Sequence, residues 1–311
     1  MTERRWDAVI VGAGFAGLYM LHRLRGLGLK ARVLEAGSGV GGTWYWNRYP
    51  GARCDIESMQ YSFQFDDDLQ QEWEWTERYA AQPEILEYAN HVCDRFKLRD
   101  GIAFDTRVRS AVFDEATGAW TVETEKGDRH TAAYCIMATG CLSAPNDPKF
   151  PGMETFQGPT YHTGRWPHEG VDFTGQRVAI IGTGSSSIQS IPIIAAQAKH
   201  LTIFQRTANY AIPAHNHALD PAFQKSWKAE YPSHRARAKT TVSGVLFDFN
   251  DVKAVETPDE KRIAEYEMRW QRGGLSFLGA FSDLLVDPQA NATAANFVRA
   301  KIRAVVEDAD T

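Results

Sequence analysis

The sequence predicts an α/β fold built from two strand, turn and helix units followed by a helical segment. An apolar run, a glycine-rich turn and a helical apolar pattern follow one another within residues 7–35, and the same order recurs within 177–206. This order is typical of a buried parallel strand that leads into a helix. Apolar residues at helical spacing then occupy most of 218–311. We therefore expect two Rossmann-like domains followed by a helical segment.

The first unit contains GxGxxG at Gly12, Gly14 and Gly17, between its strand and its helix. In a dinucleotide site the first glycine permits a tight turn, the second lets the backbone approach a pyrophosphate, and the third lets the helix pack on the strand. Its second strand ends at Glu35, at the distance where an acid accepts hydrogen bonds from a ribose hydroxyl. The unit thus predicts an adenine dinucleotide site. The alternative, a glycine-rich turn in another α/β protein, leaves Glu35 unexplained.

A loop rich in glycine and aromatic residues follows Glu35. Such a loop is costly to order, which favours a large flat ligand as its partner. Trp44, Tyr45, Trp46 and Tyr49 are each explained as core aromatics when taken singly, but as a set they predict a wall around a cofactor.

Period-two patterns predict four short strands at 102–108, 110–113, 120–123 and 134–137. The last strand runs into Ala138-Thr139-Gly140, which is how a chain returns to a nucleotide sheet. A proline-rich stretch then predicts a stiff connection between domains. The expected organisation is a first nucleotide domain at 1–141, a linker at 142–155, a second nucleotide domain at 156–217 and a helical segment at 218–311.

The second unit has GxGxxS at Gly182, Gly184 and Ser187. Ser187 adds a Cβ where the helix meets the strand, but it leaves the phosphate-binding amides in place. The second strand ends in Gln205-Arg206, where the first unit had an acid. A glutamate repels a ribose 2′-phosphate, whereas an arginine binds it with a planar fork. The second site is therefore expected to prefer NADPH.

Composition excludes several other classes of function. The counts of 34 basic and 39 acidic residues give a net charge of −5, which favours neither nucleic acid nor an anionic membrane as a partner. The four cysteines lack metal-type spacing, and His215 and His217 lack a third ligand, so no metal site is expected. No apolar run approaches the ~20 residues that span a bilayer. We expect a soluble, cytoplasmic protein with free thiols.

With these motifs the chain resembles the type I Baeyer–Villiger monooxygenases, flavoproteins that act on phenylacetone, cyclic ketones and steroids. The resemblance covers essentially every residue, and it implies that 1–141 is an FAD-binding domain, that 156–217 is an NADPH-binding domain and that 218–311 is a helical insertion in the NADPH domain. It rests on the two glycine motifs, on the stretch GTWYWNRYPGARCDIES at 42–58, and on a fingerprint formed by Phe156, Gly158, His162, Trp166 and Pro167.

The resemblance implies two cofactors and a set of contacts for each. Asp55 would be the catalytic residue of this chain. His162 would belong to a hinge that couples the domains, although a simple turn histidine explains it as well. FAD would contact Gly12, Gly14, Phe15, Gly17, Glu35, Gly42, Thr43, Trp44, Tyr45, Trp46, Asp55, Tyr61 and Val108. NADPH would contact Arg53, Thr183, Gly184, Ser185, Ser186, Ser187, Ile188, Gln189, Arg206 and Thr207.

The implied reaction inserts one oxygen atom of O₂ next to a ketone carbonyl, giving an ester or lactone, with NADPH reducing FAD. Asp55 would tune an active-site arginine. The family carries that arginine beyond Thr311, so we expect an N-terminal portion of a longer enzyme. One alternative is a flavin N- or S-monooxygenase, against which the fingerprint around His162 argues. The other alternative is an inactive fragment that binds nucleotides.

Overall fold

The computed structural model describes residues 3–207, 209–241 and 243–307. The chain divides into two compact units, each assembled from separate stretches of sequence. The first unit comprises Met1–Ala52, Ala81–Arg177 and Pro192–His200, and the second comprises Arg53–Ala80, Val178–Ile191 and Leu201–Thr311.

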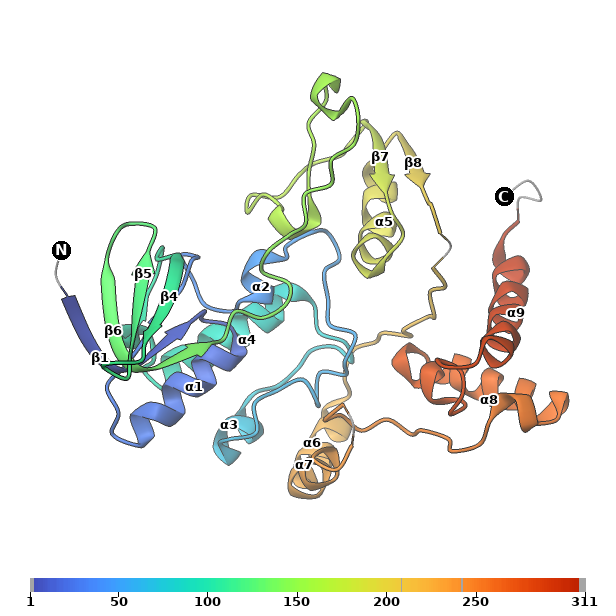
Figure 1. Cartoon of the computed structure of the whole chain (residues 1–311). Helices are drawn as coiled ribbons and strands as arrows, with labels where there is room; N and C mark the ends of the chain where they lie inside the picture. Colours follow the sequence, from blue (N-terminus) through green and yellow to red (C-terminus); the bar gives the residue numbers. More distant parts are fainter. Residues whose placement is uncertain (1–2, 208, 242, 308–311) are drawn as a thin grey trace. The chain divides into compact units, whose positions relative to one another are not determined.

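A six-stranded sheet forms the centre of the first unit (Figure 1). The central strand β1 pairs in parallel with β2 and with β6, and β2 pairs in parallel with β3. Strands β6, β5 and β4 form an antiparallel meander at the other edge. The strands, in spatial order, are β3 (Ile102–Ala103), β2 (Ala31–Leu34), β1 (Glu3–Val11), β6 (Arg129–Met137), β5 (Ala119–Thr124) and β4 (Val108–Asp114).

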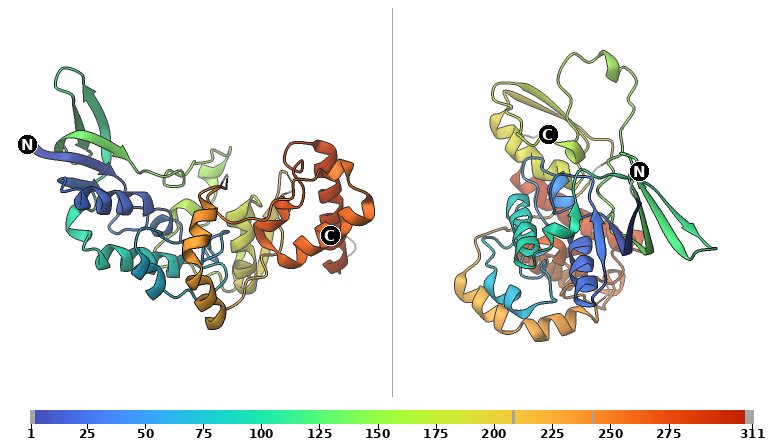
Figure 2. Two further views of the ribbon diagram at one scale, coloured as in Figure 1. Left: turned by 90° about the horizontal axis from the view of Figure 1, so that it is seen from below. Right: turned by 90° about the vertical axis from the view of Figure 1, so that its left-hand side faces the viewer.

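Helices α1 (Phe15–Gly26) and α4 (Gln82–Arg95) lie side by side in this unit (Figures 1 and 2). Their rings meet edge to face, with centroids 6.1 Å apart for Phe15 and Tyr88 and 4.8 Å apart for His22 and Phe96. Short helices α2 (Thr43–Trp46) and η1 (Arg99–Gly101) complete this region. An apolar cluster lies in the core of the sheet, where Val9, Leu34, Val122 and Ala132 pack together out of contact with water.

The predicted return of the chain to the nucleotide sheet is confirmed, since β6 lies beside β1 with Ala8 opposite Tyr134. The predicted strand at 102–108 is wrong. Strand β3 ends at Ala103, and Asp105 then takes a positive φ of 50°. The turned backbone donates from Asp105 N to Gly37 O (3.0 Å) and from Thr106 N to Glu35 O (2.7 Å). Pairing with the loop after β2 has therefore replaced extension of the strand.

The second glycine motif joins a two-stranded sheet to a helix, as predicted. Strand β7 pairs with β8, and helix α5 connects them (Figure 1). Their bounds are β7 (Arg177–Ile181), α5 (Ser185–Gln197) and β8 (His200–Phe204). The second unit is otherwise mainly helical, with α3 (Asp67–Glu72), α6 (Pro221–Ala229), α7 (Tyr231–Ala238), η4 (Ala254–Glu256), α8 (Asp259–Arg272), η5 (Gly274–Gly279) and α9 (Pro288–Val305).

An aromatic cluster holds α8, η5 and α9 together. Tyr266 and Phe277 stack with ring centroids 5.5 Å apart, and Phe281 meets Tyr266 edge to face at 5.3 Å. Aromatic side chains supply much of the buried apolar area in such a small helical core. The helical character predicted for 218–311 is thus confirmed. Within the described ranges, no helix is long and apolar enough to cross a membrane.

Candidate functional site

Backbone geometry within the protein explains why positions 12 and 17 of the first glycine turn are glycines, without any contact with a ligand. Gly12 has a φ of +103°, and a Cβ there would lie 2.6 Å from the carbonyl oxygen of Ala138. A Cβ at Gly17 would lie 1.9 Å from the carbonyl oxygen of Gly12, so α1 packs directly on the turn. The positive φ of Gly12 disfavours any other residue, and the backbone contacts at Gly12 and Gly17 leave no space for a Cβ.

Gly14 has no such internal reason to be glycine. Its φ is −74°, and a Cβ there would meet only Gly42 Cα, at an ordinary contact distance of 3.5 Å. Glycine at this position therefore leaves room in front of the N-terminus of α1, where free amide groups and the helix dipole favour an anion. The residues fit the pyrophosphate of a dinucleotide.

Glu35 is buried, with 4% of its surface exposed, and both of its carboxylate oxygens are held by backbone amides. Ala13 N donates to Oε2 at 2.6 Å, and Gly37 N donates to Oε1 at 2.7 Å. A carboxylate accepts up to about four hydrogen bonds, so it keeps the capacity to accept from ribose hydroxyls. Thr106 N donates to the Glu35 carbonyl oxygen at 2.7 Å, and Val108 begins β4 two residues later, where its side chain packs against the sheet core.

Tyr45 anchors the loop that follows Glu35. Its hydroxyl accepts from Ser38 N at 3.1 Å and lies 2.8 Å from Ser38 Oγ. Its ring lies so close to Gly37 that a Cβ there would be 2.6 Å from a ring carbon. Trp44 and Tyr45 are buried, whereas Gly42, Thr43 and Trp46 are half-buried. Tyr45 thus packs against its own loop, in addition to any contact that it makes with a cofactor.

The second glycine turn repeats the geometry of the first. Gly182 has a φ of +102°, and a Cβ at Gly184 would meet nothing within 4 Å. Gln205 Nε2 donates to Thr183 Oγ1 at 2.7 Å, which fixes the turn beside the end of β8. Ser185, Ser186, Ser187 and Ile188 form the first turn of α5, and Arg206 and Thr207 follow β8 on the surface. No described residue makes a hydrogen bond or ion pair with the exposed Arg206 guanidinium.

Asp55 lies in the second unit, where Gln189 of α5 reaches it. Gln189 Nε2 donates to Asp55 Oδ1 at 3.3 Å and to the carbonyl oxygen of Arg53 at 3.2 Å. Desolvation raises the pKa of the Asp55 carboxyl above its usual value, and the hydrogen bond from Gln189 opposes this rise. The structure thus brings Arg53, Asp55 and Gln189 together.

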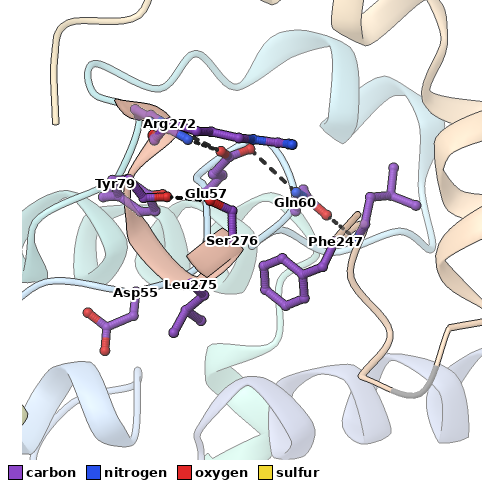
Figure 3. A pocket seen from close by; sticks show the side chains of 11 residues that line it. Asp55, Glu57, Gln60, Tyr79, Phe247, Arg272, Leu275 and Ser276 are labelled. Carbon is purple, nitrogen blue, oxygen red and sulfur yellow. Dashed lines mark hydrogen bonds and ion pairs between the residues drawn. The ribbon is translucent and has the colours of Figure 1, made fainter. Parts of the chain in front are cut away.

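Asp55 also lines a pocket that the sequence did not indicate (Figure 3). Glu57 accepts from Arg78 Nη2 at 2.7 Å, and Gln60 Oε1 accepts from Leu246 N at 2.6 Å. The lining of the pocket combines the apolar side chains of Leu246, Phe247 and Leu275 with the polar side chains of Asp55, Glu57 and Arg272. Tyr61 follows this segment, and its amide donates to the carbonyl oxygen of Glu57 at 3.1 Å.

The fingerprint residues fold the connecting segment between β6 and β7. The Phe156 ring lies against Gly158, where a Cβ would be 2.8 Å away. Trp166 is buried with Phe173, their ring centroids 6.1 Å apart. Pro167 accepts from Gly170 N at 3.1 Å. The short helices η2 (Met153–Thr155) and η3 (Thr163–Arg165) complete the segment.

His162 caps η3, because its Nδ1 accepts from Gly164 N at 3.1 Å. The accepting nitrogen carries no proton, so the structure gives this side chain a turn-forming role. We expect His162→Ala to destabilise the protein by about 1 kcal/mol through loss of the cap. His162→Asn offers an oxygen in place of Nδ1 and should recover most of that loss in thermal denaturation. Equal losses in both variants would contradict the capping role.

The fold contains two glycine turns of the kind that binds the pyrophosphate of a dinucleotide. Each glycine turn joins a strand to a helix, one near a buried acid and the other near an exposed arginine. The chain belongs to the pyridine nucleotide-disulphide oxidoreductase family, whose model matches residues 9–268.

Known relatives confirm the resemblance to Baeyer–Villiger monooxygenases. A Baeyer-Villiger monooxygenase of Pseudooceanicola batsensis is 45% identical over 97% of this chain and 56% of its own length. A phenazine N-monooxygenase of Lysobacter antibioticus is 43% identical over 99% of this chain and 58% of its own. The structure of an oxidised steroid monooxygenase bound to NADP matches with a TM-score of 0.93 and 55% identity, over 98% of this chain and 58% of that one. The chain thus spans just over half the length of these relatives.

The cysteines do not support the disulphide chemistry for which the family is named. All four are free. Burial raises the pKa of Cys54 and of Cys93 to about 11, so both remain thiols near neutral pH. Since the thiolate is the reactive form, these residues are poorly suited to dithiol exchange.

Proposed function

We propose that this protein is an FAD- and NADPH-dependent monooxygenase of the Baeyer–Villiger type, acting in the cytoplasm on a small ketone. The observation that carries the proposal is the pair of glycine turns of opposite 2′ preference in one chain. The relatives support the same function, because several of them bear the names of ketone monooxygenases. The domain boundaries predicted from the sequence are retained as part of this proposal.

In this proposal FAD occupies the Gly12 to Glu35 turn and NADPH the Gly182 to Arg206 turn. The amide groups at the start of α1 and α5 bind the two pyrophosphates, and Glu35 orients the FAD ribose. When bound, FAD would accept electrons from NADPH and react with O₂. The remaining contacts proposed for each cofactor are those that the resemblance implies.

The ketone is proposed to bind beside Asp55, next to the hollow of Figure 3, which is itself too small to hold more than a water molecule. Phe247 and Leu275 of its lining would contact the carbon skeleton. Arg78 is paired with Glu57, and Arg272 is paired with Asp248. In the described part of the chain the Asp55 carboxylate has no such cation, so it is placed to hold a cationic donor beside the substrate carbonyl.

Product analysis tests this function. The FAD-loaded protein is incubated with NADPH, O₂ and a ketone, a thioether or an aromatic amine, and the products are separated by chromatography. An ester or lactone from the ketone is the expected product. N-oxygenation is the second candidate, because one relative is a phenazine N-monooxygenase. An N-oxide formed without any ester would replace the first proposal by the second.

Arg206 is expected to select NADPH over NADH. Its exposed guanidinium lies just past β8, where a ribose 2′-phosphate would be bound. A charge-assisted contact of this kind contributes about 1.5 to 3 kcal/mol. Arg206→Ala should therefore raise the KM for NADPH about tenfold or more and leave the KM for NADH nearly unchanged. Equal losses for both coenzymes would show that Arg206 does not contact the 2′-phosphate.

A further inference from the structure

Arg53 is fixed at both its main chain and its side chain. Its amide donates to Gln189 Oε1 at 3.3 Å, and its carbonyl oxygen accepts from Gln189 Nε2 at 3.2 Å. At the other end, Nη1 donates to Glu77 Oε2 and to the carbonyl oxygen of Tyr79, both at 2.8 Å. The guanidinium thus has an orientation imposed by residues outside the glycine turns.

Glu77 is itself held in place by a second segment. Asn216 Nδ2 donates to the same Glu77 Oε2 at 2.7 Å, while Asn216 Oδ1 accepts from Tyr79 N at 2.9 Å. An isolated antiparallel β-bridge between Glu77 and Ala218 also holds the backbones of the two segments together. Hydrogen bonds from Arg53 and Asn216 hold the pKa of Glu77 below its usual value, so this carboxylate stays ionised at neutral pH.

One edge of the Arg53 guanidinium remains available. In the part of the chain that the structure describes, Nε and Nη2 have no hydrogen-bond partner, and 29% of the side chain is exposed. A planar guanidinium with a free edge can bind a phosphate with two parallel hydrogen bonds. Gln189, which clamps Arg53, belongs to the helix whose first turn is the proposed NADPH pyrophosphate site.

We propose that Glu77, held by Asn216, is a positioning residue that turns the free edge of Arg53 toward NADPH. This inference rests on the proposed function, because it takes the second glycine turn as the NADPH site. A half-exposed ion pair contributes little to stability, so a purely structural role predicts almost no effect when Glu77 is removed. A purely electrostatic role predicts tighter NADPH binding, since an acid near a phosphate site repels it. A positioning role predicts weaker NADPH binding when Glu77 is removed. The direction of the change in NADPH affinity therefore distinguishes the structural, electrostatic and positioning roles.

The test measures NADP⁺ binding directly, by calorimetric titration of the FAD-loaded protein, together with its melting temperature. Glu77→Ala should raise the Kd for NADP⁺ about five- to tenfold. Glu77→Gln keeps an acceptor oxygen for Arg53 and should recover part of the affinity. Glu267→Gln is the matched control, because the ion pair of Glu267 with Lys301 has side-chain exposures of 41% and 29%, against 39% and 29% for Glu77 and Arg53. The control should bind NADP⁺ as the unmodified protein does.

Each outcome decides the inference. A higher Kd in Glu77→Ala, with partial recovery in Glu77→Gln and an unchanged melting temperature, supports positioning. An unchanged or lower Kd in Glu77→Ala overturns it while leaving the NADPH site in place. If the unmodified protein fails to bind NADP⁺, the proposed function fails first and the inference falls with it.

Discussion

Replacing Gly14 by valine is expected to abolish FAD binding while leaving the first unit folded. The protein makes room for a Cβ at this position, with only Gly42 Cα in contact at 3.5 Å, and the backbone angle of −74° suits any residue. The valine side chain would instead occupy the space that a pyrophosphate needs at the start of α1. The measurement is the flavin absorption of the purified variant after incubation with excess FAD.

Gly17→Ala provides the contrast, because its Cβ would lie 1.9 Å from the carbonyl oxygen of Gly12. This variant should lose several kcal/mol of stability through displacement of α1, and it should lose flavin only as a consequence of unfolding. Circular dichroism distinguishes the two losses. A Gly14→Val protein that keeps its full flavin content would refute the placement of the pyrophosphate.

Asp55→Asn is expected to lower the rate of ketone oxygenation by about 10²-fold, the loss that follows when one electrostatic stabiliser is removed from an active site. In the proposed function Asp55 holds a cation beside the substrate carbonyl, and an amide of the same shape carries no charge to do so. The variant keeps a hydrogen-bond partner for Gln189, so the local fold should persist. Steady-state rates of ester formation measure the effect.

The pH dependence of the same variant gives a second observation. Desolvation raises the pKa of Asp55, so its carboxyl becomes charged only at a higher pH than an ordinary aspartate. Oxygenation in the unmodified protein should require the ionised carboxylate and should fall as the pH is lowered through the pKa of Asp55, and Asp55→Asn should lack this limb. Because the folded state holds this proton more tightly than the unfolded chain, ionising Asp55 costs stability as pH rises. At alkaline pH, Asp55→Asn should therefore melt at the same temperature as the unmodified protein or at a higher one. A lower melting temperature for the variant would contradict the raised pKa of Asp55.

The two nucleotide units could be predicted from sequence because local chemistry determines them. Gly17 is required by a backbone contact with Gly12 five residues away, Gly12 itself has a positive φ, and Glu35 is held by amides of the same unit. The expectation that the first site excludes a ribose 2′-phosphate and that the second site binds one rested on Glu35 and Arg206 alone.

Features that depend on distant contacts could not be predicted in the same way. The strand at 102–108 was lost because Asp105 and Thr106 pair with the loop after β2. The pocket beside Asp55 joins residues more than two hundred positions apart, from Asp55 to Ser276, which no local pattern links. The link between Glu77 and Asn216 likewise follows no sequence periodicity.

Anaerobic mixing of the FAD-loaded protein with NADPH or with NADH tests most directly the claim that one chain carries both nucleotide sites. The account predicts that NADPH bleaches the flavin absorption of the protein, and that NADH does so only at concentrations about tenfold higher or more. A protein that binds no flavin, or whose flavin is reduced equally well by both coenzymes, would contradict it.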